Sequence, residues 1–141
     1  MASQILKRVM SLLGISLATL LGACGKNPTP RDIIGTWANA DGAELMVEEN
    51  GQFTAHALPQ ATFWRRDQPG PAFDGKGTWK LQKGAPYWEL KLWFREISGQ
   101  SANREITVLV SGGGLSTYLY RWKGEEGEDQ YKLERRSVPP H

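Results

Sequence analysis

Hydrophobic and polar residues alternate along most of the chain after residue 32. The clearest case is residues 87–95, where Trp88, Leu90, Leu92 and Phe94 fall on one side and Tyr87, Glu89, Lys91, Trp93 and Arg95 on the other. A helix, with 3.6 residues per turn, would mix these two sets, so the pattern predicts a β-strand with one buried face. Residues 43–48 and 52–57 alternate in the same way around Asn50-Gly51, a dipeptide typical of tight β-hairpins.

The same reasoning predicts eight strands, at 33–39, 43–48, 52–57, 77–82, 87–95, 105–110, 115–122 and 130–136, with a weaker candidate at 61–66. Residues 67–75 and 98–103 are expected to be loops. Sequential antiparallel strands joined mostly by hairpins predict an all-β domain, a small antiparallel up-and-down β-barrel of about eight strands, because closure removes exposed strand edges. A two-sheet β-sandwich is the alternative.

The N-terminal residues follow a different pattern. After Lys7 and Arg8, residues 9–23 carry no charge. As a helix, these residues would be about 22 Å long, which is short of the ~30 Å hydrocarbon core of a bilayer. A basic start, an apolar run and small residues at its end predict that residues 1–23 are a cleavable, helical signal peptide.

The apolar run ends in Leu21-Gly22-Ala23-Cys24, and Cys24 is the only cysteine of the chain. This motif resembles a lipobox, the signal read by lipoprotein signal peptidase. The resemblance implies that Cys24 becomes the lipidated first residue, which attaches a protein stably to a membrane without a spanning helix. An ordinary signal peptide followed by a fortuitous cysteine is the alternative. Because Gly25 rather than Asp follows the cysteine, the resemblance also implies the outer membrane, facing the periplasm, or the plasma membrane in a Gram-positive host.

Cleavage before Cys24 would leave 118 of the 141 residues. We expect a lipidated tether at 24–31, extended at Pro28 and Pro30, then a domain at 32–136 and a tail at 137–141. Without Lys7 and Arg8, the 17 Lys and Arg become 15, which equals the 15 Asp and Glu. A mature chain near neutrality carries no electrostatic footprint for nucleic acid.

Two short sequence motifs resemble those of a known protein family. Gly35-Thr36-Trp37 near the first strand resembles the Gly-x-Trp signature of lipocalin and wider calycin barrels, and a late Tyr-x-Leu-x-Arg ends at Arg135. In those families a basic residue near the last strand packs across the Trp that closes one end of the barrel. The resemblance implies that Trp37 and Arg135 form this barrel-closing pair, an interaction worth about 0.5–2 kcal/mol. It also implies a lipocalin-like domain.

No catalytic constellation has convincing spacing, since His56 and His141 are the only histidines. We therefore expect no enzyme activity, no cofactor and no metal site. Six Trp, four Tyr and four Phe instead suggest non-catalytic binding of a small apolar or aromatic ligand, although such residues also fill the interior of small barrels. The alternative is a protein–protein interaction module, an adaptor or inhibitor in the envelope. The candidate binding surface is Trp93, Tyr118, Tyr120 and Trp122.

Overall fold

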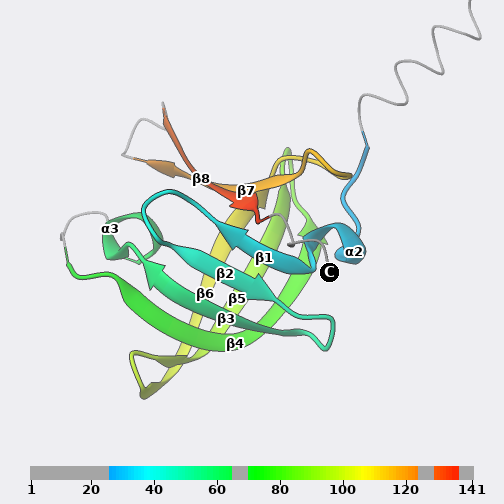
Figure 1. Ribbon diagram of the computed structural model, residues 1–141. Helices are drawn as coiled ribbons and strands as arrows, with labels where there is room; N and C mark the ends of the chain where they lie inside the picture. Colours follow the sequence, from blue (N-terminus) through cyan, green and yellow to red (C-terminus); the bar gives the residue numbers. More distant parts are fainter. Residues whose placement is uncertain (1–25, 65–69, 124–128, 137–141) are drawn as a thin grey trace, which may run out of the picture.

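The computed structural model describes residues 26–64, 70–123 and 129–136, which form one closed barrel of eight antiparallel strands (Figure 1). Each strand pairs with the next along the chain, and the last pairs with the first. The strands are β1 (Gly35–Ala38), β2 (Glu44–Val47), β3 (Gln52–Leu58), β4 (Phe73–Lys83), β5 (Trp88–Ile97), β6 (Gln100–Val110), β7 (Tyr118–Lys123) and β8 (Asp129–Arg135). The predicted up-and-down barrel is confirmed, and the sandwich alternative is wrong.

The alternation along β5 places its side chains as expected. Leu90, Leu92 and Phe94 are fully buried inside the barrel, whereas Trp93 is 40% exposed on the outside. The predicted hairpin at Asn50-Gly51 joins β2 to β3, and Gly51 has a positive φ of 86°. Period-two patterning therefore identified both the strands and their buried faces.

The two ends of the barrel differ. We call the end that carries the turns at 48–51, 84–87 and 111–117 the tether end, because residues 26–29 lead into the barrel there. The one-turn helix α2 (Pro30–Ile33) covers this end, and its first turn is fastened by a 2.9 Å hydrogen bond from the Thr29 amide to the Asp32 carboxylate. That hydrogen bond is the largest of the influences that lower the pKa of Asp32. The opposite, far end carries the short helix α3 (Gln60–Phe63) and the Ser98-Gly99 turn (Figure 1).

Some sequence-based expectations need correction. In the weaker strand candidate at 61–66, the described residues 61–64 are not a strand, because a helical turn begins after Pro59 and places Phe63 in the core. Strand β4 already begins at Phe73, within the expected 67–75 loop, since its glycine-rich start pairs with β3 and β5 on both sides. Strand β6 likewise begins at Gln100, within the expected 98–103 loop, because Ser98 and Gly99 make a tight turn with positive φ.

Two further boundaries shift at the tether end. Pro30, expected in an extended tether, begins α2 instead, a position that the fixed φ of proline favours. Leu115 does not begin β7. The Thr117 hydroxyl donates to the carbonyls of Gly112 and Gly114 over 2.9 and 2.8 Å and holds residues 112–117 in a turn.

Candidate functional site

Trp37 and Arg135 face each other across the seam between β1 and β8. They are a register pair, and the Arg135 guanidinium lies 4.5 Å from the centre of the buried Trp37 ring. The guanidinium also donates to the carbonyls of Ile34, over 3.0 Å, and Asp32, while the Trp37 indole N–H donates to Ile33 O over 2.8 Å. The pair thus ties α2 to both strands of the seam.

Aromatic rings fill the interior of the barrel. Phe53 and Phe94 meet edge to face with centroids 4.8 Å apart, and Phe73 packs against Phe94 at 5.8 Å. Trp64 extends this stack from the end of α3, 5.6 Å from Phe73. These aromatic side chains therefore pack the core, as interior side chains do in other small barrels.

The outer face around Trp93 combines polar and aromatic contacts. The Trp93 indole N–H donates to Asn103 Oδ1 over 2.7 Å, and the Arg95 guanidinium lies 5.0 Å from the ring centre. Arg95 also donates to Asn103 Oδ1 over 3.2 Å. We call these three residues, with Lys91 and Glu105 beside them, the Trp93 face. A shallow groove of about 380 Å³ runs between it and the outward side chains of β4.

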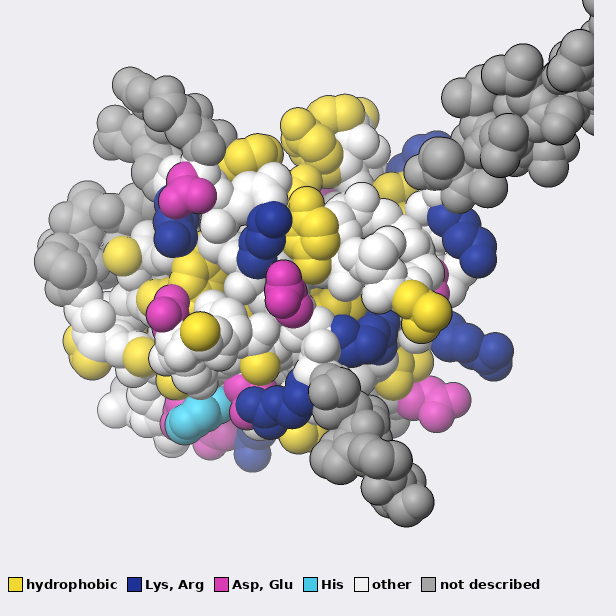
Figure 2. All heavy atoms as spheres, turned by 45° about the horizontal axis from the view of Figure 1, so that its top comes forward, with side chains coloured by type: hydrophobic (Ala, Val, Ile, Leu, Met, Phe, Trp, Pro, Cys, Tyr) yellow, Lys and Arg dark blue, Asp and Glu magenta, His cyan; other side chains and the backbone are white. Residues whose placement is uncertain are grey.

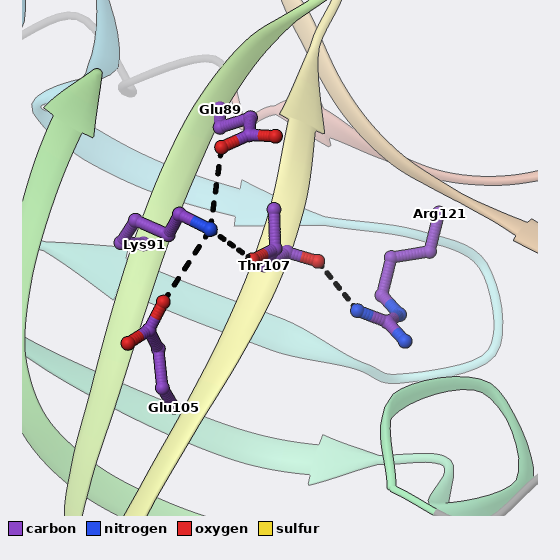
Figure 3. A network of polar contacts seen from close by, with 5 residues as sticks. All are labelled: Glu89, Lys91, Glu105, Thr107 and Arg121. Atoms are coloured by element: carbon purple, nitrogen blue, oxygen red, sulfur yellow. Dashed lines mark hydrogen bonds and ion pairs between the residues drawn. The ribbon is translucent and has the colours of Figure 1, made fainter. Parts of the chain in front are cut away.

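Lys91 organises the polar part of this face (Figure 3). Its ammonium lies 3.2 Å from Glu89 and 3.4 Å from Glu105, and it donates to the Thr107 hydroxyl over 2.8 Å. Burial alone would lower the pKa of Lys91, but the hydrogen bonds and charges of the two glutamates outweigh it and hold that pKa above its ordinary value. The network fixes Lys91 and Glu105 beside Trp93, and Glu89 on the far side of Lys91. The sequence signal for this network is the alternation of charge along the outer face of β5, whereas its partners on β6 become adjacent only through strand pairing.

The aromatic residues of β7 lie on the outside of the barrel. Tyr118 and Tyr120 have ring centroids 5.7 Å apart, and Tyr120 and Trp122 meet edge to face at 5.6 Å. Lys132 of β8 lies 4.6 Å over the Tyr118 ring. Tyr120 is only 5% exposed. Figure 2, with the top of Figure 1 turned forward, shows hydrophobic side chains gathered on this side of the molecule.

The structure does not join Trp93 to the β7 aromatic cluster. Trp93 pairs with Glu105 of β6, whereas Tyr120 pairs with Leu109, four residues further along the same strand. The Lys91–Thr107 pair lies between them. The four residues of the candidate binding surface therefore belong to two separate patches with a charged network in between.

Arg121 was not identified from the sequence, and it seals a second seam. Only Leu109–Tyr120 and Val110–Leu119 pair β6 with β7, so the two strands diverge toward the far end. There the Arg121 guanidinium donates to the carbonyl of Thr107 (Figure 3). Its Nε also donates to Thr62 O of α3 over 2.7 Å. Arginine supplies several donors in a fixed fork, which suits a gap lined by carbonyl groups.

The side chains of His56 and Asp74 are in contact, which the sequence did not suggest. His56 Nδ1 lies 2.9 Å from Asp74 Oδ1 in a shallow groove that also contains Ser98. Both side chains are about two-thirds exposed, at 67% and 63%. Among the described residues, no hydrogen bond links Ser98 to His56.

The lipobox residues Leu21, Gly22, Ala23 and Cys24 lie outside the described residues, as does the tail at 137–141. Within the described ranges, no three His, Asp or Glu side chains are grouped so that they could hold a metal ion. The helices of those ranges are too short to cross a membrane. A comparison with known proteins gives no match to a family model, to a curated protein or to a solved structure.

Proposed function

We propose that this protein is an envelope lipoprotein, anchored through Cys24 and facing the periplasm, whose lipocalin-like barrel binds another envelope protein through the Trp93 face without catalysing a reaction. The observation that carries the proposal is Trp93 itself, a large apolar ring that is 40% exposed and yet fixed by Asn103 and Arg95. Trp and Arg are the residue types most enriched in binding hot spots.

The Trp93 face is ordered before any partner arrives. Asn103 accepts hydrogen bonds from both the indole and Arg95, and the Lys91 network holds Glu89 and Glu105 in place. Ordering of free side chains costs about 0.5–1.5 kcal/mol for each one immobilised on binding. A preordered face avoids much of this cost, which supports a role in recognition.

The pairing of β5 supports side-chain recognition over strand addition at the Trp93 face. Strand β5, which carries Trp93, is paired along its length with β4 on one side and β6 on the other, so a partner peptide cannot extend it. A partner that binds the Trp93 face must therefore read the outer side chains. The groove beside Trp93 offers it an apolar anchor flanked by both signs of charge.

The filled interior favours this proposal over the small-ligand alternative. A carrier of an apolar molecule needs space among its core side chains, and here Phe53 and Phe73 both pack against Phe94 in the core. A native mass spectrum of the Cys24→Ser domain, secreted with an ordinary signal peptide, separates the two. A bare monomer mass supports the interaction module, whereas an excess mass that disappears on denaturation supports the carrier.

The direct test is loss of partner binding on removal of the Trp93 ring. The lipidated protein is crosslinked in its own membrane, the crosslinked protein is identified, and its affinity for the purified domain is measured. Trp93→Ala is expected to weaken that affinity about 30-fold, the effect of a hot spot worth about 2 kcal/mol. Met46→Ala is the matched control, because Met46 is 41% exposed on β2 and lies outside the Trp93 face. Equal affinities of both variants and the parent would contradict the proposal.

A further inference from the structure

The chain that leads to Cys24 is packed onto the tether end of the barrel. The Gly113 amide donates to Lys26 O over 2.9 Å, and Pro28 is buried. A methyl group added at Gly113 would lie only 2.5 Å from Asn27 O, so this approach requires glycine. Residues 26–28 are therefore part of the domain surface rather than a free leash.

This packing limits how far the anchor can lie from the barrel. Cys24 precedes Lys26 by two residues, so their Cα atoms are at most about 7 Å apart. Leu115 follows Gly113 by two residues, which places its Cα within about 20 Å of that of Cys24. The far end is much more distant, since β6 alone has 11 residues and extends about 35 Å.

The tether end carries exposed apolar and aromatic side chains beside this short connection. Leu115, at the tip of the 111–117 turn, is 98% exposed, and Tyr87 on the neighbouring 84–87 turn is 45% exposed. Tyr118 begins β7 where the 111–117 turn ends, and its backbone pairs with Ser111. An isolated Leu needs no explanation, but a Leu at the same end of the barrel as two tyrosines and the proposed lipid attachment point matches the composition of protein surfaces at a membrane–water interface.

The charged side chains near the 84–87 and 111–117 turns also suit a membrane–water interface. Lys26 on the tether and Lys83 before the 84–87 turn are both exposed. Two acids near these turns are already engaged, because Asp32 accepts hydrogen bonds from Thr29 and Glu89 pairs with Lys91, whereas Glu48 and Glu49 lie on the 48–51 turn. Lysines close to a bilayer surface are attracted by anionic headgroups.

We propose that the tether end of the barrel rests on the phospholipid bilayer that holds the anchor, with Leu115 inserted at the boundary of headgroups and acyl chains and with Tyr87 and Tyr118 at headgroup level. The proposal rests on the proposed lipidation of Cys24. The barrel then has one orientation on the membrane, with α3 and the Ser98-Gly99 turn held away from it (Figure 1).

Site-specific labelling of the full, lipidated protein tests this orientation. Because Cys24 is the only cysteine and its thiol is consumed by the lipid, Leu115→Cys creates a single reactive site for a fluorophore. Gln100→Cys is the matched control, since Gln100 is also exposed but lies at the far end. Both proteins are reconstituted in vesicles of phosphatidylethanolamine and phosphatidylglycerol, with and without brominated acyl chains.

We expect brominated lipids to quench the label at position 115 at least three-fold more than the label at position 100. Equal quenching at both positions, in protein whose mass shows the acylated Cys24, would overturn the orientation and leave the lipoprotein proposal intact. A mass without acyl chains, together with protein that does not stay on the vesicles, would overturn both proposals.

Discussion

Arg135 lies over the face of Trp37, with its guanidinium carbon 4.5 Å from the ring centre, and the two residues pair across the seam that closes the barrel. The contact joins residues that are 98 positions apart in the chain. Gly35 makes room for it, since a Cβ at that position would lie 3.1 Å from Arg135 Nη1 and its φ is +138°. One guanidinium therefore links the first strand, the last strand and α2.

Substitution of Arg135 by lysine should destabilise the barrel by about 2 kcal/mol. Lysine keeps the charge but cannot reach the carbonyls of Asp32 and Ile34 with two donors while it stacks on Trp37. Urea unfolding of the secreted Cys24→Ser domain measures the change. Arg136→Lys is the control and should shift stability by less than about 0.5 kcal/mol, because Arg136 makes an exposed pair with Glu44. Similar losses in both variants would contradict a special role for Arg135.

Loss of the second arginine, Arg121, should destabilise the barrel locally rather than throughout. Arg121→Met should leave the carbonyls of Thr107 and Thr62 without this donor and cost about 2 kcal/mol. Hydrogen exchange should accelerate most in β7 and α3, the elements that Arg121 joins. Arg104→Met is the comparison, since Arg104 also donates to a backbone carbonyl, of Trp64, but is exposed. Uniform acceleration across all strands would show that the seam is not locally held.

Because two tyrosines are buried, we expect the folded barrel to lose stability at high pH. Burial, and then the proximity of Tyr87 and Tyr118, raise the pKa of Tyr120 above its usual 10.0, and burial likewise raises that of Tyr131. A group whose pKa is raised by folding stabilises the folded state below its unfolded pKa, and this contribution is lost as pH rises through the folded pKa. Stability should therefore fall above about pH 10.

Tyr120→Phe checks this reasoning, because phenylalanine cannot ionise. Between pH 9 and 11, about one unit on each side of the ordinary tyrosine pKa, the variant should lose stability less steeply than the parent domain in urea unfolding. Lys91 and Tyr131 contribute the same direction of change in both proteins. Identical slopes for the two proteins would mean that Tyr120 ionises in the folded state as readily as in the unfolded state.

The packing of the tether is tested by Gly113→Ala. The added methyl group has to push Asn27 away, which should weaken the hydrogen bond from the residue 113 amide to Lys26 O. We expect faster tryptic cleavage after Lys26 and faster exchange of the residue 113 amide, with little change in the unfolding midpoint. Ser116→Ala, at an exposed position of the same turn, should leave both rates unchanged. Unchanged cleavage in Gly113→Ala would show that the tether is not held by this contact.

The sequence by itself determined which segments are strands wherever one face is buried. Leu90, Leu92 and Phe94 alternate with polar neighbours because a pleated strand turns successive side chains to opposite sides, and this is a local property of the chain. The same holds for Asn50-Gly51, where the turn needs backbone conformations that few residues adopt.

Other features of the fold and of the candidate site were decided only by the tertiary structure, because these features depend on contacts between residues that are distant in the sequence. The start of β4 at Phe73 and of β6 at Gln100 carry no alternating pattern, and they are strands because neighbouring strands pair with them. The separation of Trp93 from Tyr120, the burial of Tyr120 on the outside and the placement of Arg121 at the open part of a seam all follow from barrel closure. Register across a closed sheet is a global property, since every strand must satisfy two neighbours at once.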